Sequence, residues 1–285
     1  MRSREASAIV NDTEKGAAEL AADAARSVAG LEKDEVQDYL KELLEGRAVM
    51  SPLVNLANEI FLAIEEGEDH REAAEDFLDL IDKGGEKASK ICADILKDEE
   101  CRKVLTLSYS STVVKALKST DKVIVLESRP AKEGRKTAEI LAKSGVKVEY
   151  WVDAGMCKAL EKVDAVLVGA DTVAVDGFLN KLGTRPLSIC AEKAGIPFYV
   201  VCDSTKILLD AIPAPDGEEC PAEEVWSTSD IDGRDNIKVM NDYFELTEWD
   251  KQKLITEDGA VKDIERKVKE KEVSKGVLRF YPAKA

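Results

Sequence analysis

Polar side chains that could bind and act on a small anion follow five short apolar runs in the second half of the chain. They occupy residues 108–111, 127–130, 153–155, 169–171 and 203–204. The set combines hydroxyls, an arginine and several carboxylates. Small hydroxyl residues at a helix start, as in the first of these segments, leave backbone N–H groups free to hold a phosphate. We therefore predict a site for a small, polyhydroxylated anion.

Cysteine and histidine usage disfavours a metal site and a Ser–His or Cys–His triad. The six cysteines are scattered without a CxxC pair, and we interpret them as small buried hydrophobic residues rather than as disulfides or metal ligands. The single histidine, His70, lies in the polar stretch EEGEDHREAAED, which predicts a solvated helical residue. Neither GxxxxGK[ST] nor GxGxxG occurs, so a P-loop and ordinary dinucleotide binding are unsupported. We expect no metal and no cofactor.

The composition predicts a folded, acidic protein. Among 285 residues, 41 are Lys or Arg and 57 are Asp or Glu, so the net charge is 41 − 57 = −16. An acidic surface repels phosphate backbones, which makes nucleic acid a poor direct partner. No apolar run approaches the roughly 20 residues that span a bilayer, and the amino terminus lacks the apolar segment of a secretory signal. We expect a cytoplasmic protein without a membrane partner.

Residues 1–100 show the 3.6-residue period of helices. Apolar residues spaced three or four apart over residues 51–67 are typical of an amphipathic helix. A long acidic helix or helix pair follows over residues 71–100, and Gly84 and Gly85 predict a bend or a break in it. We expect residues 1–100 to form a helical amino-terminal domain.

From Arg102 onward the pattern changes to short apolar runs separated by helix-like stretches. The runs are RKVLTL, KVIVLE, VKVEYW, DAVLVG and PFYVVC. Alternating strands and helices predict a parallel sheet with helices on both faces, and ligands bind at the carboxyl ends of such strands. The predicted fold class is α/β, with the helical amino-terminal domain followed by a doubly wound, Rossmann-like parallel-sheet domain over residues 101–285.

Three motifs in a fixed order are far more specific than any one of them alone. They are LTLSYSSTVVKAL, VIVLESRPAKEGRKTAEIL and VDAVLVGADTVAVDGFLNKLGTRPLSICAEKAGIPFYVV. In this order they resemble the translation initiation factor 2B regulatory-subunit family, which also includes methylthioribose-1-phosphate isomerase and ribose-1,5-bisphosphate isomerase. The resemblance extends over essentially the whole chain through EKGAAELAADAA, GRAVMSPLVNL and IKVMNDYFELTEWDKQKLITEDGAV.

The resemblance implies that the isomerases of this family use a cysteine and an aspartate that face each other across the sugar. Asp171 matches the aspartate, whereas Ser108 stands at the cysteine position. A thiol, with a reference pKa of about 8.5, serves as acid and base near neutrality, and a serine hydroxyl is a far weaker acid. Cys157 is an alternative thiol after the third strand, while Cys190 and Cys202 are expected on an apolar helix and strand. An efficient isomerase is therefore disfavoured.

The same resemblance implies a set of residues that surround the phosphate and the sugar. These are Lys15, Gly16, Arg47, Ser108, Tyr109, Ser110, Arg129, Asn180 and Lys181. Lys15 stands where the isomerases carry an arginine, and only arginine grips a phosphate with a planar fork. Tyr109 replaces the asparagine of the isomerase loop and matches the Tyr-Ser of the regulatory subunits. The alternative is that the basic members are ordinary surface charges.

The expected function is that of an initiation factor 2B regulatory-subunit-like protein, which binds a sugar phosphate or nucleoside monophosphate in a degenerate isomerase cleft. The alternatives are an aldose–ketose isomerase acting on ribose 1,5-bisphosphate or methylthioribose 1-phosphate, and a structural partner without a ligand. Translation initiation factor 2 is a candidate partner. The resemblance implies a homodimer or higher homo-oligomer. The apolar helix after Asn180 and the pair Tyr243 and Phe244 could form the contact between subunits. The alternative is that this helix and this pair pack in the core of the chain.

Overall fold

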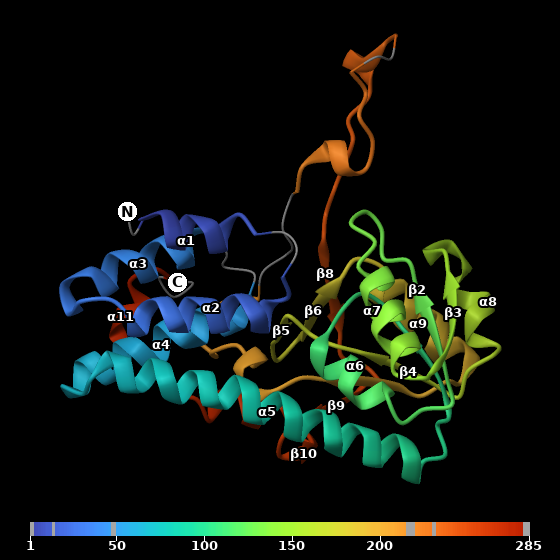
Figure 1. Ribbon diagram of the computed structural model, residues 1–285, viewed down its shortest axis with the longest axis horizontal. Helices are drawn as coiled ribbons and strands as arrows, with labels where there is room; N and C mark the ends of the chain where they lie inside the picture. Colours follow the sequence, from blue (N-terminus) through green and yellow to red (C-terminus); the bar gives the residue numbers. More distant parts are fainter. Residues whose placement is uncertain (1–2, 13–14, 47–49, 215–219, 230–231, 282–285) are drawn as a thin grey trace.

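The chain folds into a helical part and a sheet part that lie side by side (Figure 1). The structure is a computed structural model that describes residues 3–12, 15–46, 50–214, 220–229 and 232–281. Both parts have the architecture that the sequence predicts. In the described ranges, no helix is long and apolar enough to cross a membrane.

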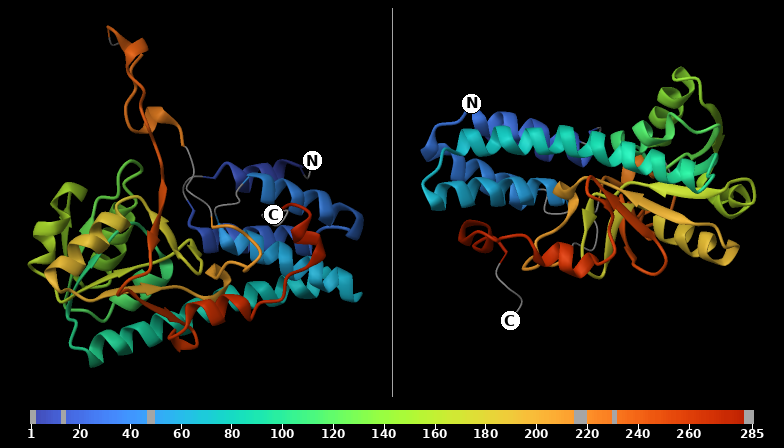
Figure 2. Two further views of the ribbon diagram at one scale, coloured as in Figure 1. Left: turned by 180° about the vertical axis from the view of Figure 1, so that it is seen from behind. Right: turned by 90° about the horizontal axis from the view of Figure 1, so that it is seen from below.

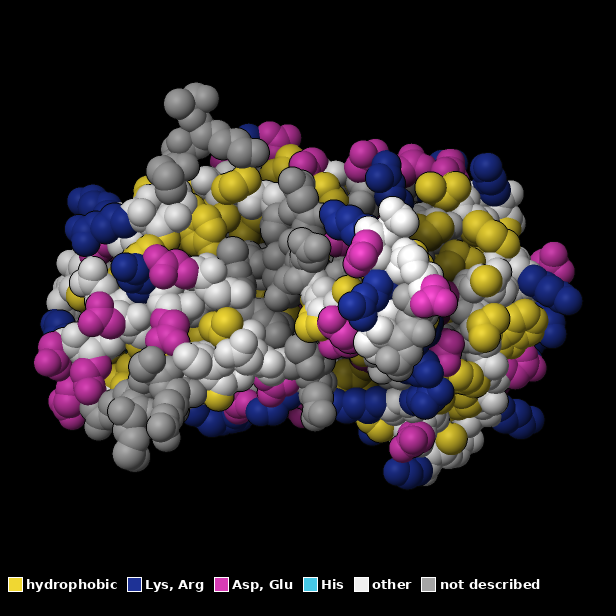
Figure 3. All heavy atoms as spheres, turned by 90° about the horizontal axis from the view of Figure 1, so that it is seen from above, with side chains coloured by type: hydrophobic (Ala, Val, Ile, Leu, Met, Phe, Trp, Pro, Cys, Tyr) yellow, Lys and Arg dark blue, Asp and Glu magenta, His cyan; other side chains and the backbone are white. Residues whose placement is uncertain are grey.

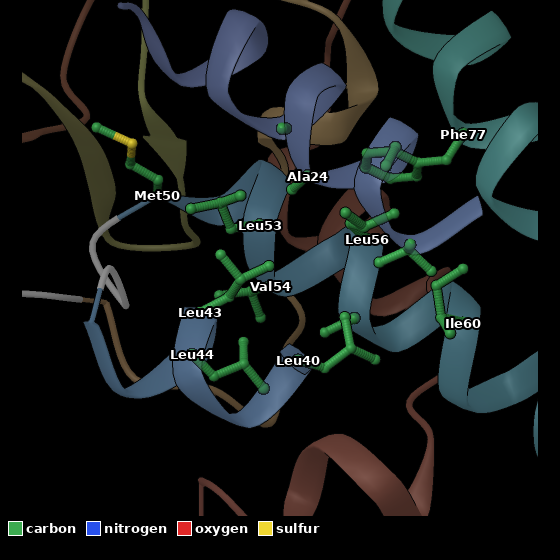
Figure 4. Packing of buried hydrophobic residues seen from close by; sticks show 14 of the residues in the cluster. Ala24, Leu40, Leu43, Leu44, Met50, Leu53, Val54, Leu56, Ile60 and Phe77 are labelled. Carbon is green, nitrogen blue, oxygen red and sulfur yellow. The ribbon is translucent and has the colours of Figure 1, made fainter. Parts of the chain in front are cut away.

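Within the described residues up to Asp98, the helical part is built from five helices. They are α1 Ser3–Val10, α2 Ala17–Ala29, α3 Lys33–Gly46, α4 Ser51–Glu66 and α5 His70–Asp98. Leucine and other apolar side chains of α2 to α5 meet in one core, because their helical spacing places them on one face of each helix (Figure 4). Leu43, Leu53 and Leu56 are completely buried there.

Helix α5 is one continuous helix of 29 residues, so the predicted break at its two glycines is wrong. It runs beneath both parts of the molecule (Figure 1). A Cβ atom at Gly84 would lie 3.2 Å from Asp203 Cβ, which shows that this glycine permits a close approach between α5 and the sheet part. Further along α5, Ala88, Cys92 and Leu96 belong to the core on one face of the sheet.

The sheet has the order β10-β9-β7-β4-β1-β2-β3. Its strands are β1 Lys103–Thr106, β2 Lys122–Leu126, β3 Lys147–Trp151, β4 Ala165–Val168, β7 Phe198–Val201, β9 Lys253–Thr256 and β10 Gly259–Ala260. All pairs are parallel except β9 with β10. The five apolar runs of the sequence are β1, β2, β3, β4 and β7, which confirms the predicted parallel sheet.

Helices cover both faces of this sheet. They are α6 Ser111–Leu117, α7 Gly134–Lys143, α8 Met156–Leu160, α9 Thr184–Ala194 and α10 Ile264–Lys269. Neighbouring strand residues point to opposite faces. Val104 packs in the core with α5, α6 and α7, and Leu105 packs in the core with α8 and α9. This arrangement confirms the doubly wound fold.

A second, antiparallel sheet was not predicted. It consists of β5 Thr172–Val173, β6 Gly177–Lys181 and β8 Phe244–Glu248. The other elements in the described ranges are the 3-10 helices η1 Asp153–Gly155, η2 Ser204–Lys206, η3 Ala222–Glu224 and η4 Arg234–Asn236, and the helix α11 Lys275–Leu278. Helix α11 returns to the helical part, where Gly276 packs closely against Phe61 of α4.

Two predictions about single residues are wrong. His70 is only 3% exposed, and its Nε2 lies 3.1 Å from the carbonyl oxygen of Leu31, because the start of α5 packs against the turn between α2 and α3. Cys157 of α8 and Cys190 of α9 form a disulfide with their Cα atoms 5.6 Å apart. Their separation in sequence is 33 residues, and only the packing of α8 on α9 brings them together.

The disulfide leads to a testable prediction. Under denaturing, non-reducing conditions we expect four of the six cysteines to react with a thiol reagent, and all six after reduction. We expect Cys157→Ser to lower the free energy of unfolding by about 3–4 kcal/mol, the chain-entropy value for a loop of this length. Cys92→Ser, outside the disulfide, serves as the matched control for the thiol count. Six reactive cysteines before reduction would contradict the pairing.

Candidate functional site

A cleft lies where the carboxyl ends of β1, β4 and β7 meet the amino ends of α2 and α6. Its inner part is lined by residues 16–19, 108–112, 169–171, 180, 201–203 and 206. Its outer part, of about 970 Å³, includes Lys15, Lys132, Glu133, Lys181 and Tyr243. Gly16, Ala17, Ser108, Tyr109 and Asp171 line both parts, so the two are continuous.

The loop after β1 is held by two neighbouring segments. Ser108 has a φ of 68°, in the left-handed region. Its N–H donates to Ser128 Oγ over 2.7 Å, and its carbonyl accepts from Thr137 Oγ1 over 2.7 Å. Ser110 is the N-cap of α6, with its side chain accepting from the Val113 N–H. These bonds fix the loop at the cleft.

The loop after β2 supports this arrangement but does not bring its arginine into the cleft. The N–H groups of Ser128 and Arg129 each donate to the Asp153 carboxylate over 2.8 Å. The Arg129 guanidinium donates to the carbonyls of Pro130 and Val225. Arg129 is not among the described residues that line the cleft. The placement therefore does not favour the anion contact that the sequence predicts for this residue.

Asp171 directly follows β4 and the short Gly-Ala turn. Its N–H donates to the Leu179 carbonyl over 2.9 Å, which fixes the backbone against β6. Burial raises the pKa of the Asp171 carboxyl, while the charges of Lys206 and Lys181 act to lower it and Glu133 acts to raise it. The carboxyl lines the cleft within the electrostatic reach of both lysines, where it can accept a hydrogen bond from a sugar hydroxyl.

Lys181, at the end of β6, is paired in the structure. It is only 2% exposed, and its Nζ lies 2.7 Å from Glu133 Oε1 and 4.2 Å from the centroid of the Tyr243 ring. Glu133 Oε2 is buried and has no hydrogen-bond partner among the described residues. The Lys181 charge is therefore largely balanced by Glu133, and the second Glu133 oxygen is available to a ligand hydroxyl. The motifs of the sequence did not indicate Glu133.

Lys206 is a further cleft residue that the sequence reasoning missed. It ends η2 and is buried, and it lines the inner part together with Asp171 and Asn180. The only signal in the sequence was its position three residues after Asp203, at the end of the fifth apolar run. Its charge stands close enough to Asp171 to affect the pKa of that carboxyl.

The predicted residues of the helical part lie at the cleft mouth or outside the described residues. Lys15 is exposed, with its Nζ 2.8 Å from Asp23 Oδ2. Gly16 precedes α2, and its N–H donates to Glu19 Oε2 over 3.4 Å. Arg47 lies outside the residues that the structure describes.

Tyr109 and Asn180 both line the inner part of the cleft. The Tyr109 hydroxyl donates to Glu19 Oε1 over 3.4 Å, and Lys136 Nζ lies 3.7 Å from the centroid of the ring. Asn180 is buried and donates from Nδ2 to Thr184 Oγ1 over 2.9 Å. Tyr109 thus connects the β1 loop to α2, and Asn180 connects β6 to the start of α9.

Neither Cys157 nor Cys202 is suited to proton transfer near neutrality in the cleft, and Cys220, outside the disulfide, lines only its outer part. Cys157 is held in the disulfide and does not line the cleft. Cys202 lines the inner part, but burial raises the pKa of its thiol well above its ordinary value. A thiol of such high pKa is both a weak acid and almost never a thiolate at neutral pH.

The arrangement can bind an anion and hold hydroxyl groups. The first turns of α2 and α6 face the inner part, where their N–H groups and the Lys206 charge attract a phosphate. Asp171, Asn180 and Glu133 offer acceptors to sugar hydroxyls. In the described ranges, no group of three His, Cys, Asp or Glu side chains could hold a metal ion.

Known proteins resemble the chain over most of its length. It is 29% identical over 248 residues to a ribose 1,5-bisphosphate isomerase of Archaeoglobus fulgidus, covering 80% of this chain and 76% of the relative. It is 30% identical over 243 residues to a putative translation initiation factor eIF-2B subunit 2-like protein of Pyrococcus abyssi, covering 82% and 83%. The crystal structure of the Pyrococcus horikoshii translation initiation factor eIF-2B superposes with a TM-score of 0.77 at 25% identity, covering 93% of this chain and 98% of that one.

The fold is shared with an enzyme as well. The 5-methylthioribose 1-phosphate isomerase of Pyrococcus horikoshii superposes with a TM-score of 0.70 at 24% identity, covering 94% of this chain and 86% of that one. A sequence profile of the initiation factor 2 subunit family matches residues 4–263. Because this match spans almost the whole chain, the protein belongs to the initiation factor 2 subunit family, which confirms the resemblance seen in its motifs.

Proposed function

We propose that this protein binds a sugar phosphate or a nucleoside monophosphate in the cleft and acts as a regulatory-subunit-type member of its family. One observation carries the proposal. The residue that faces the cleft from the β1 loop is Ser108, at the position where the resemblance implies a catalytic cysteine, and Asp171 lines the same cleft. The binding groups are thus present, with a hydroxyl in place of a thiol at this position of the β1 loop.

The charges of the cleft support binding of an anion. The whole chain carries a net charge of −16, yet Lys15, Lys132, Lys181 and Lys206 all line the cleft. Lys181 is balanced by Glu133, and Lys206 is a buried cation that lines the inner part of the cleft together with the first turns of α2 and α6. A phosphate at this end would place the sugar near Asp171 and Asn180.

An aldose–ketose isomerase is the second candidate. The observation in its favour is the Asp171 carboxyl, which lines the cleft and whose pKa is raised by burial. The similarity to a ribose 1,5-bisphosphate isomerase also supports it. In this case Asp171 would work with an acid other than a thiol, and the rate would be low because one positioned acid commonly contributes about 10²–10⁴-fold.

Further proposals concern the cellular compartment, the oligomeric state and the protein partner. We propose that the protein is cytoplasmic and forms a homodimer or a larger homo-oligomer. Translation initiation factor 2 is proposed as a partner. The family name and the similarity to eIF-2B proteins support these proposals.

Thermal unfolding with and without ligand tests the binding proposal. With ribose 1,5-bisphosphate or AMP at about 100 times Kd, the folded state gains about 2.7 kcal/mol, so we expect the midpoint to rise by about 5–10 °C. We expect Asp171→Asn to weaken binding by about 10–150-fold, because it removes a charged hydrogen-bond acceptor. Asp176→Asn, the same change at an exposed turn outside the cleft, is the matched control.

Two outcomes would contradict the proposal. If neither ribose 1,5-bisphosphate, AMP nor a hexose phosphate shifts the midpoint, the cleft does not bind this class of ligand. The second contradicting outcome is that the wild-type protein converts ribose 1,5-bisphosphate to ribulose 1,5-bisphosphate at rates typical of metabolic enzymes and that Asp171→Asn loses this activity. The protein is then an aldose–ketose isomerase.

A further inference from the structure

The disulfide between α8 and α9 lies at the exposed edge of the sheet part. Strand β3 is the edge strand, and α8 follows it at the end of the molecule far from helices α1 to α4 (Figure 1 and the left view of Figure 2). Cys157 is exposed and Cys190 is half-buried. Hydrophobic side chains are exposed at the surface of the sheet part as well (Figure 3). The disulfide is therefore within reach of a reactant in solution.

The segment between β3 and α8 has little packing of its own. None of residues 152–158 is buried, and only Ala159 and Leu160, at the end of α8, reach the core. Helix α8 has five residues, far fewer than the roughly 12–15 that a helix needs to be stable alone in water. Few buried contacts are typical of segments that open locally in the folded state. The covalent bond from Cys157 to α9 therefore contributes much to the order of this segment.

Asp153, four residues before Cys157, holds the loop after β2. Its carboxylate accepts the N–H groups of Ser128 and Arg129, each over 2.8 Å. A charged acceptor binds backbone N–H groups more strongly than a neutral one does. The 3-10 turn that contains Asp153 leads directly into α8, which starts at Met156. The position of the Asp153 carboxylate thus depends on the position of α8.

The loop that Asp153 holds also forms part of the cleft. Residues 130–133 line its outer part. Ser128 Oγ accepts from the Ser108 N–H, and Thr137 Oγ1 donates to the Ser108 carbonyl, both over 2.7 Å. The segment after β2 therefore lines the cleft itself and fixes the backbone of the β1 loop, which lines both parts of the cleft.

The other end of the disulfide belongs to a helix that starts at the cleft. Cys190 lies in α9, which begins at Thr184. Thr184 Oγ1 accepts from Asn180 Nδ2 over 2.9 Å and donates to the Lys181 carbonyl over 2.6 Å. Asn180 and Lys181 both line the cleft. The disulfide thus connects the helix that starts beside these residues to the turn that holds the β2 loop.

We propose that Cys157 and Cys190 are a redox-active pair, and that their reduction by a dithiol weakens the binding of ligand in the cleft. The inference rests on the proposed function, because its ligand is the sugar phosphate or nucleoside monophosphate named there. Exposed disulfides are the labile ones in thiol–disulfide exchange. Once the bond is reduced, η1 and α8 gain freedom and Asp153 no longer has a fixed place. Asp153 is the positioning residue between the disulfide and the cleft.

Reduction takes place by two successive exchanges. A thiolate of the dithiol attacks the Cys157 sulfur, the bond between Cys157 and Cys190 breaks, and the Cys190 thiolate leaves and takes up a proton. The second thiol of the reductant loses its proton and attacks the reductant's own sulfur in the mixed disulfide, which releases Cys157 as a thiolate that takes up a proton. The protein gains two electrons and two protons, and the dithiol becomes a disulfide.

Isothermal titration with ribose 1,5-bisphosphate, before and after treatment with dithiothreitol, tests the proposal on the full chain. We expect Kd to rise by about 5–150-fold on reduction, the range of a typical coupling between two sites, and to return on reoxidation. The double variant Cys157→Ser and Cys190→Ser is expected to have the weaker Kd with or without dithiothreitol. Cys101→Ser, before β1 and outside the disulfide, is the matched control and should keep the full redox effect. Circular dichroism checks that each variant is folded.

Asp153→Asn tests the connection between the disulfide and the cleft. We expect it to weaken binding in the oxidised protein and to leave a further redox effect of at most about twofold, because both changes act on the same connection. A redox effect of unchanged size in Asp153→Asn would show that the coupling does not pass through this carboxylate, and would overturn the inference.

Amide hydrogen exchange without ligand separates this inference from the proposed function. The N–H groups of Ser128 and Arg129 are expected to exchange faster after reduction, because Asp153 no longer protects them. A Kd that reduction leaves unchanged overturns the inference and leaves the proposed function intact. If ribose 1,5-bisphosphate binds in neither state, the proposed function fails. The exchange rates then decide whether the redox pair controls the β2 loop, and equal rates in the two states overturn the inference.

Discussion

Replacing Ser108 with cysteine is expected to raise the turnover of ribose 1,5-bisphosphate by about 10²–10⁴-fold over the wild-type protein, the usual contribution of one well-placed acid or base. The substitution exchanges a hydroxyl for a thiol on a loop that two hydrogen bonds to its backbone already hold in place. Serine already adopts the left-handed φ of 68° at this position, so cysteine requires no change of backbone conformation. Formation of ribulose 1,5-bisphosphate is the measurement.

The matched control separates the thiol from a general effect on the loop. Ser108→Ala changes the same loop position without adding a thiol and is expected to leave turnover at the wild-type level. Combining Ser108→Cys with Asp171→Asn is expected to remove the gain, because both groups work on the same sugar. Equal rates for the wild-type protein and Ser108→Cys would show that a thiol at this position is not what the cleft lacks.

Replacing Lys206 with methionine is expected to weaken the binding of a sugar phosphate by about 30- to 5,000-fold. The estimate follows from the roughly 2–5 kcal/mol lost when one member of a buried charge pair is truncated. Lys206 is buried and lines the inner part of the cleft together with the first turns of α2 and α6, so a phosphate bound there would lose a buried positive charge. Isothermal titration with ribose 1,5-bisphosphate measures the change.

Lys158→Met, on α8 and away from the cleft, is the matched control and should leave Kd unchanged. Lys206→Arg keeps the charge and is expected to retain more affinity than the methionine variant. A Kd of Lys206→Met within about threefold of the wild-type value would contradict this prediction, because 1.4 kcal/mol already corresponds to about tenfold. The phosphate would then bind elsewhere in the cleft.

Elements with a strong local pattern could be predicted from the sequence. Strands β1, β2, β4 and β7 are apolar runs because they are buried on both faces of a parallel sheet. The second sheet could not be predicted in the same way. Strand β6 contains the start of the NKLGT segment, and this segment by its sequence predicts a turn before a helix. The segment is a strand because it pairs with β8, which is distant in sequence.

In the candidate site, too, some residues follow from a local sequence pattern and others depend on contacts between distant segments. Ser108, Tyr109, Ser110, Asp171 and Asn180 follow or belong to patterned segments, and the structure brings them to one cleft. Whether a charged loop residue also reaches that cleft depends on side-chain contacts between segments distant in sequence, which no sequence motif indicates. The Arg129 guanidinium turns to the Val225 carbonyl. Glu133 lies inside a family motif that assigned it no role, Lys206 follows the last apolar run, and both line the cleft.

By itself, the sequence determined the order of helices and strands, the polar ends of the strands and the family. These follow from periodicities and motifs within short stretches of chain. The tertiary structure alone decided which polar groups meet, how Lys181 is balanced by Glu133, that His70 is buried and that Cys157 joins Cys190. The physical reason is that each of these depends on the distance between segments, which the packing of the sheets and helices sets and no local pattern contains.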